Sequence, residues 1–95
     1  MKEKYVIVMR TSCDKKFIER VAREDPFDYW NRCISPGTDK DTFDVENPKT
    51  DVLINEAGDF PYTHEIAYFT DSPDVIEAVI MYFGAGNIKH FQKKE

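Results

Sequence analysis

The chain has 95 residues, and we expect one α+β domain over residues 1–95. Hydrophobic residues make up 41% of it and aromatic residues 14%, which excludes an intrinsically disordered protein. The formal net charge is -5, and residues 39–59 alone carry seven Asp or Glu against two Lys, while the flanking segments cancel. Because an acidic field repels phosphate, direct nucleic-acid binding is not expected.

The cysteine count and the apolar runs indicate the compartment. Two cysteines, Cys13 and Cys33, are too few for the disulfide framework of a small secreted domain, so a reducing, cytoplasmic location is expected. The apolar run at residues 5–9 is too short for a signal peptide, and no run has the length of a membrane span. We therefore expect no membrane association.

The first part of the chain is predicted to hold a strand and two helical pieces. Residues 5–9 form an unbroken β-prone run, typical of a strand covered on both faces. Thr11 or Ser12 offers an N-cap for an amphipathic helix, whose apolar residues are Phe17, Ile18, Val21 and Ala22. Pro26 interrupts this helix, and Asp25 is expected to cap a second short one.

The last part of the chain has the clearest signals for where its helix and strands begin and end. Residues 66–69 form a predicted strand, and Ser72 with Pro73 gives the N-cap and first position of a helix. One face of that helix is apolar: Val75, Ile76, Val79, Ile80 and Phe83. Gly84 then ends the helix, and residues 88–91 form a closing strand.

The acidic middle is less regular. Residues 43–46 fit either a short edge strand or a loop, and residues 52–54 form a brief strand. The element order then becomes strand, helix, strand pair, helix, strand. This order predicts a small two-layer α+β sandwich of the ferredoxin-like kind (βαββαβ), with two helices on one sheet face and an irregular acidic middle.

Neither a zinc site nor a calcium site is expected. A zinc shell would need Cys13, Cys33, His64 and His90, but these lie 20, 31 and 26 positions apart, whereas structural zinc ligands come in close pairs. Residues 39–46 crowd four carboxylates, but an EF-hand loop starting at Asp39 would have Phe43 at its fifth position and Asp44 where it needs glycine. No cofactor is predicted.

Catalysis is not predicted either. Cys13 precedes a predicted helix, whose dipole would favour its thiolate, but no nucleophile elbow or other local catalytic context accompanies it. The glycines at 84 and 86 follow a helix, whereas a phosphate-binding loop precedes one.

The acidic middle is instead predicted to bind a partner. Aromatic residues accompany the acids, as at many interfaces: Phe43, Phe60 and Tyr62. The predicted partner-binding residues are Asp39, Asp41, Phe43, Asp44, Glu46, Asp51, Glu56 and Asp59. We therefore expect a non-catalytic interaction module that binds a basic or nucleic-acid-binding site on a larger protein, in the manner of a phage or mobile-element inhibitor. The alternative is a small ligand-sensing regulatory domain that acts as a homodimer.

Overall fold

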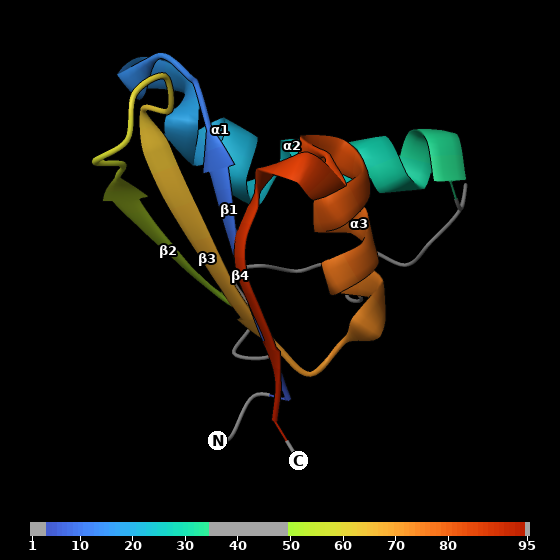
Figure 1. Ribbon diagram of the computed structural model, residues 1–95. Coiled ribbons are helices and arrows are strands. Elements are labelled where there is room, and N and C mark those ends of the chain that lie inside the picture. Colours follow the sequence, from blue (N-terminus) through green and yellow to red (C-terminus); the bar gives the residue numbers. More distant parts are fainter. Residues whose placement is uncertain (1–3, 35–49, 95) are drawn as a thin grey trace.

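The computed structural model describes residues 4–34 and 50–94, which form an α+β fold of two layers. Four strands make the sheet, and three α-helices pack on it together with short 3-10 and π-helical turns (Figure 1). In chain order the elements are β1 (Tyr5–Thr11), η1 (Lys15–Phe17), α1 (Ile18–Arg23), α2 (Asp25–Tyr29), η2 (Trp30–Ile34), β2 (Thr50–Glu56), β3 (His64–Thr70), α3 (Pro73–Phe83), η4 (Ala85–Asn87) and β4 (Ile88–Lys93).

The sheet is antiparallel and has the order β2-β3-β1-β4. In its register, Val8 on β1 lies opposite Ala67 on β3 and His90 on β4, and Leu53 on β2 lies opposite Ala67 from the other side. It follows that β1 runs parallel to β2 with β3 between them, and that β3 runs parallel to β4 with β1 between them. The sheet edges are β2 and β4.

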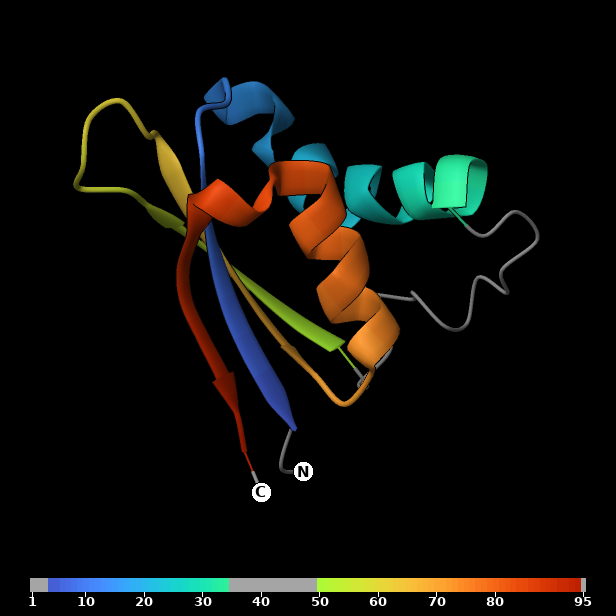
Figure 2. The same ribbon diagram turned by 45° about the vertical axis from the view of Figure 1, so that its right-hand side comes forward.

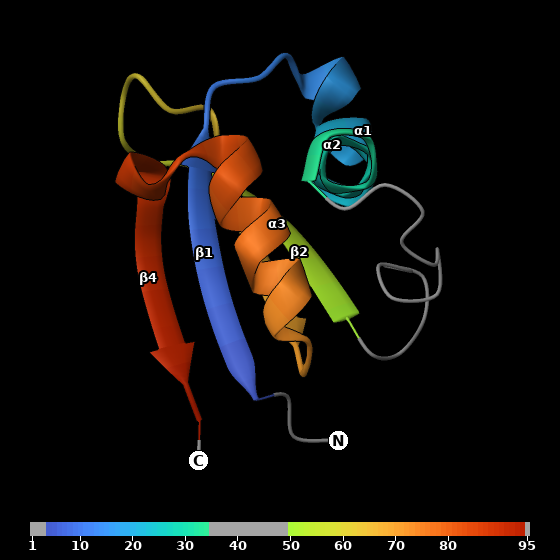
Figure 3. The same ribbon diagram turned by 90° about the vertical axis from the view of Figure 1, so that its right-hand side faces the viewer.

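The core lies between the sheet and the helices. Ile7 and Met9 on β1, with Ile66 and Tyr68 on β3, are fully buried in one cluster with side chains from all three helices. Figures 1 and 2 show the helices on the same side of the sheet, and Figure 3 looks nearly along α2, with α3 in front of the strands. Because burying one such side chain contributes about 1.5–3 kcal/mol, this cluster is the main source of stability.

The first helical region is broken where Pro26 enters it. A proline has no backbone N–H, and in a continuous helix the N–H of residue 26 would bond the carbonyl of Ala22. The chain instead bends at Glu24, whose backbone has φ -120° and ψ -50°, between α1 and α2. The hydroxyl of Tyr68 on β3 donates a 2.5 Å hydrogen bond to the Ala22 carbonyl. A residue of the sheet thus supplies the donor that the proline lacks.

The predicted α+β sandwich is confirmed, but the ferredoxin-like expectation needs correction in its helical layer. Three helices pack on the sheet in place of the two of the ferredoxin-like pattern, so the order of elements is not the classic one. The division of the first helical region at Pro26 is as the sequence predicts, and η2 extends its second half. The expectation that the first strand is covered on both faces holds only in part: on the face away from the helices Val6 is buried, but Val8 is only half-buried.

The predicted helix ends are correct for the last helix and wrong for the first. Gly84 ends α3 with φ 93°, a left-handed conformation that a residue with a Cβ rarely adopts. At the first helical region, Thr11 still belongs to β1, and Asp14 provides the cap by accepting a 3.1 Å hydrogen bond from the Lys16 N–H. Residues 43–46 lie outside the described ranges. No helix in the described part of the chain is long and apolar enough to span a membrane.

Candidate interaction surface

The loop between β2 and β3, residues 57–63, carries the most exposed aromatic ring of the described chain. Phe60 is 98% exposed, whereas Leu53, the next most exposed large hydrophobic residue, is 52% exposed. The loop projects at the end of the sheet opposite the chain ends (Figure 1). Because an aromatic ring in water gains free energy when a partner buries it, Phe60 is the strongest single anchor for a partner that the described residues offer.

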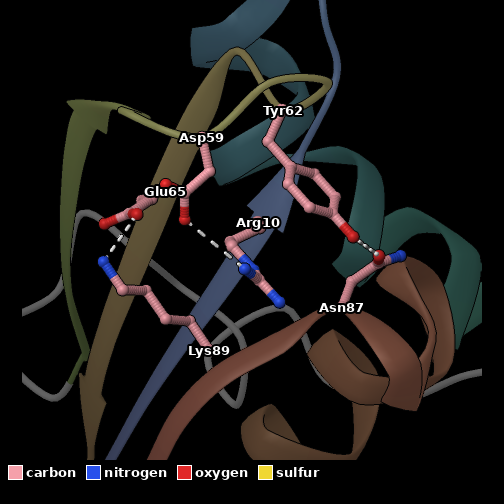
Figure 4. A network of polar contacts seen from close by, with 6 residues as sticks. All are labelled: Arg10, Asp59, Tyr62, Glu65, Asn87 and Lys89. Carbon is pink, nitrogen blue, oxygen red and sulfur yellow. Dashed lines mark hydrogen bonds and ion pairs between the residues drawn. The ribbon is translucent and has the colours of Figure 1, made fainter.

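A network of polar contacts holds this loop against the sheet (Figure 4). The guanidinium carbon of Arg10 lies 4.7 Å from the centre of the Tyr62 ring, and Arg10 Nη1 lies 3.7 Å from a carboxylate oxygen of Asp59. The Tyr62 hydroxyl donates a 3.2 Å hydrogen bond to Asn87 Oδ1 in η4. The residues on both sides of Phe60 are therefore fixed, which lowers the entropy lost when a partner binds the ring.

The same network continues across the sheet below the loop. Lys89 Nζ donates a 2.7 Å hydrogen bond to Glu65 Oε2, which joins β4 to β3 over the intervening β1. Arg10 on β1 lies beside this pair (Figure 4), and its Nε is buried with no hydrogen-bond acceptor among the described residues. Two positive groups, Arg10 and Lys89, and two negative groups, Asp59 and Glu65, thus lie in one network. Asp59 is thus partly neutralised by Arg10, which weakens its attraction for an external basic group.

The edge strand β2 carries acidic side chains that, unlike Asp59, have no basic side chain paired with them among the described residues. Asp51 and Glu56 are exposed, and no ion pair involves either of them in the described part of the chain. Leu53, between them, is 52% exposed. The opposite edge strand, β4, carries Lys89 and Lys93. The two edges of the sheet therefore differ in the sign of their charge.

The sheet face away from the helices has an apolar centre. Val6 and Ala67 are buried but do not belong to the core cluster, because strand alternation places them on this face. Val8 and Phe69 are half-buried beside them, and Leu53 extends the row to the β2 edge. The network under the loop borders this centre at one end. We call the loop 57–63, Asp51, Leu53 and Glu56 the candidate interaction surface.

Three of the predicted partner-binding residues, Asp51, Glu56 and Asp59, lie on this surface. The loop places Asp59 next to Phe60, and β2 places the other two along one edge. The remaining predicted residues lie outside the described ranges: Asp39, Asp41, Phe43, Asp44 and Glu46. The candidate calcium segment lies outside them as well.

The sequence interpretation missed two parts of this surface. The sequence pattern places Leu53 in a strand and no more, although it stands two positions from each of the polar residues Asp51 and Asn55, and residues at this spacing share one strand face, which here is the exposed one. The contact between Arg10 and Tyr62 joins residues 52 positions apart in the sequence, so no local sequence pattern predicts it.

The cysteines and histidines do not assemble into a metal site among residues 4–34 and 50–94, where no three potential ligands come together. Cys33 is exposed on η2, and His90 is exposed on β4. His64 is buried at the start of β3, where its Nδ1 lies 2.9 Å from the Thr63 hydroxyl.

Cys13 lines an open hollow of about 390 Å³ with Thr11, Ser12, Val21, Tyr82 and Phe83. Desolvation raises the pKa of the Cys13 thiol, and the adjacent Asp14 carboxylate raises that pKa further. This direction is the opposite of the dipole effect expected from the sequence. A raised pKa means that a smaller fraction of this thiol is ionised at neutral pH.

No protein-family model, no curated protein and no solved structure matches the chain.

Proposed function

We propose that the chain is a non-catalytic protein-interaction module, which binds a basic surface of a larger protein through the candidate interaction surface. The single observation that carries this proposal is Phe60, an aromatic ring that is 98% exposed on a loop held in place by Arg10 and Tyr62. A fixed aromatic anchor beside charged groups is a frequent form of binding hot spot.

The charge of the surface indicates the chemistry of the partner. Exposed Asp51 and Glu56 favour a partner with Lys or Arg around an apolar pocket that receives Phe60. A basic surface of this type is common where a protein binds nucleic acid, so the proposal includes a role as an inhibitor that occupies such a site, as phage and mobile-element inhibitors do.

Affinity capture from a cell lysate, read by mass spectrometry, tests this function. The Phe60→Ala and Glu56→Lys variants should lose the proteins that the wild type retains, because removal of a hot-spot side chain commonly costs about 2 kcal/mol or more, roughly thirtyfold in affinity. The control is Phe17→Ala on η1, which removes a 41% exposed ring that is not part of this surface. Equal capture by wild type and Phe60→Ala would contradict the proposal.

The hollow beside Cys13 favours a second candidate, a ligand-sensing regulatory domain that acts as a dimer. Its volume of about 390 Å³ lies within the range of small-molecule sites. Its polar groups already have partners, however: the Ser12 hydroxyl donates to the Pro61 carbonyl, and the Cys13 N–H donates to the Thr63 hydroxyl. A dimer in light scattering whose melting temperature rises with a metabolite would favour this candidate over the interaction module.

A further inference from the structure

We propose that the outer edge of β2 binds an extended, Lys- or Arg-containing segment of the partner protein as a fifth strand of the sheet. This inference rests on the proposed function and adds the way in which the partner is recognised. In β-strand addition, main-chain hydrogen bonds supply affinity and side chains on alternate positions supply specificity.

The backbone of β2 has hydrogen-bonding groups that point away from the sheet. The Ala57 N–H donates a 2.9 Å hydrogen bond to the Thr63 carbonyl. This bond shows which residues of β2 direct their backbone N–H and C=O groups toward β3. In an antiparallel pair these residues alternate, so the N–H and C=O of Val52, Ile54 and Glu56 point outward. No described strand pairs with this side of β2, because β2 ends the sheet order.

One side chain, Arg23 of α1, already contacts the outer edge of β2. Arg23 Nη2 of α1 lies 3.5 Å from the Val52 carbonyl, which confirms that this carbonyl faces outward. The contact is long, and the same guanidinium has a shorter bond of 2.7 Å from Nε to Glu19. The part of the edge from Ile54 to Glu56 lies beyond it and leads directly to the loop that carries Phe60.

The side chains of β2 define the segment that fits. On the open sheet face, a strand added beside β2 would place a basic residue opposite Asp51 and an apolar residue, two positions along, opposite Leu53. A second basic residue would lie near Glu56 on the other face. The expected segment therefore alternates basic, apolar and small polar residues.

Charge also selects between the two sheet edges. The β4 strand carries no acidic residue; it carries Lys93, and Lys89 paired with Glu65, so this edge does not attract a basic segment. Pairing of two copies through their β2 edges would bring Asp51 and Glu56 close to the same acids of the other copy, which is unfavourable. The β2 edge is therefore matched to a basic strand from another protein.

The test uses the whole chain and one synthetic probe, the acetylated and amidated hexapeptide Lys-Thr-Thr-Val-Thr-Lys, followed by amide hydrogen exchange in NMR. We expect binding at about millimolar concentration or below, with increased protection of the Ile54 and Glu56 amides. The matched peptide with Glu in place of both Lys should bind about tenfold more weakly. Absence of binding at several millimolar, or binding without protection of these two amides, would overturn the inference.

A variant separates the backbone contribution from the charge. Glu56→Pro removes an outward N–H that β3 does not use, and proline is tolerated at such edge positions. Its peptide affinity should fall at least about threefold below that of Glu56→Gln, which loses only the charge. If the two variants bind equally, added-strand pairing is refuted. Protection of Ile54 that increases with protein concentration in the absence of peptide would assign the edge to a second copy and overturn the inference.

The outcome is distinguishable from failure of the proposed function. Capture that depends on Phe60, in a protein whose β2 amides never gain protection, would refute only the added strand. Equal capture of proteins by wild type and by Phe60→Ala would refute the interaction surface, whether or not the peptide binds.

Discussion

Replacement of Tyr68 by Phe tests the link between the sheet and the broken helix. Tyr68 and Ala22 are both fully buried, so water cannot replace the hydroxyl that donates to the Ala22 carbonyl. The N–H of residue 26 cannot replace it either, because Pro26 has none. A buried carbonyl left without a donor costs about 1–3 kcal/mol. We expect Tyr68→Phe to lower the free energy of unfolding by about 2 kcal/mol and the melting temperature by roughly 8–15 °C.

Urea denaturation measures this change, and the slope against urea concentration should stay constant, since the fold is unchanged. The matched control is Tyr62→Phe, which removes the same atom from a partly buried 3.2 Å hydrogen bond to Asn87 and should cost about 1 kcal/mol or less. A loss below about 0.5 kcal/mol for Tyr68→Phe would refute the reasoning that this hydroxyl satisfies the carbonyl orphaned by the proline.

Three further predictions concern pH, a buried pair and the exposed ring. Burial raises the pKa of the Tyr68 hydroxyl, so the unfolded chain releases this proton at lower pH than the folded chain does. The contribution of Tyr68 to the free energy of unfolding should therefore be fully present below about pH 10 and should fall above it. Urea denaturation as a function of pH should show a less steep fall for Tyr68→Phe. The buried hydroxyls of Thr50 and Thr70 lie 2.9 Å apart, so Thr50→Val and Thr70→Val should show a coupling of about 1 kcal/mol in a double-mutant cycle, and strict additivity would contradict the contact. Phe60→Ala should leave the free energy of unfolding within about 0.5 kcal/mol of wild type, and a larger loss would mean that the ring packs within the fold.

Local patterns predicted most of the fold correctly. The apolar run at residues 5–9, the Ser72-Pro73 start and the Gly84 stop each depend on neighbours in the sequence, and each corresponds to an element of the structure. The division of the first helical region was also readable from Pro26. What the sequence did not show is how the division is stabilised, because Tyr68 lies 46 positions from Ala22 and only the folded sheet brings them together.

The candidate surface was less accessible to sequence reasoning. Charge density singles out residues 39–59, and in their described part Asp51 and Glu56 are exposed on the edge strand β2; that they bind a partner stays a prediction. Charge density gives no information on pairing, however, so the contact that engages Asp59 with Arg10 was not foreseen. The extreme exposure of Phe60 was equally hidden, since an apolar residue between turn-forming neighbours can fold inward or outward with the same local sequence.

The position of the chain ends determines how the protein can be attached to something else. The N–H of Lys94 donates a 2.7 Å hydrogen bond to the Lys4 carbonyl, and the N–H of Lys4 donates to Asp71, at the end of the sheet opposite the loop 57–63 (Figure 1). A tether joined at either end would therefore leave from one pole while the aromatic loop faces the other. A surface-immobilised or fused form should present Phe60 outward without a long linker, whichever end carries the attachment.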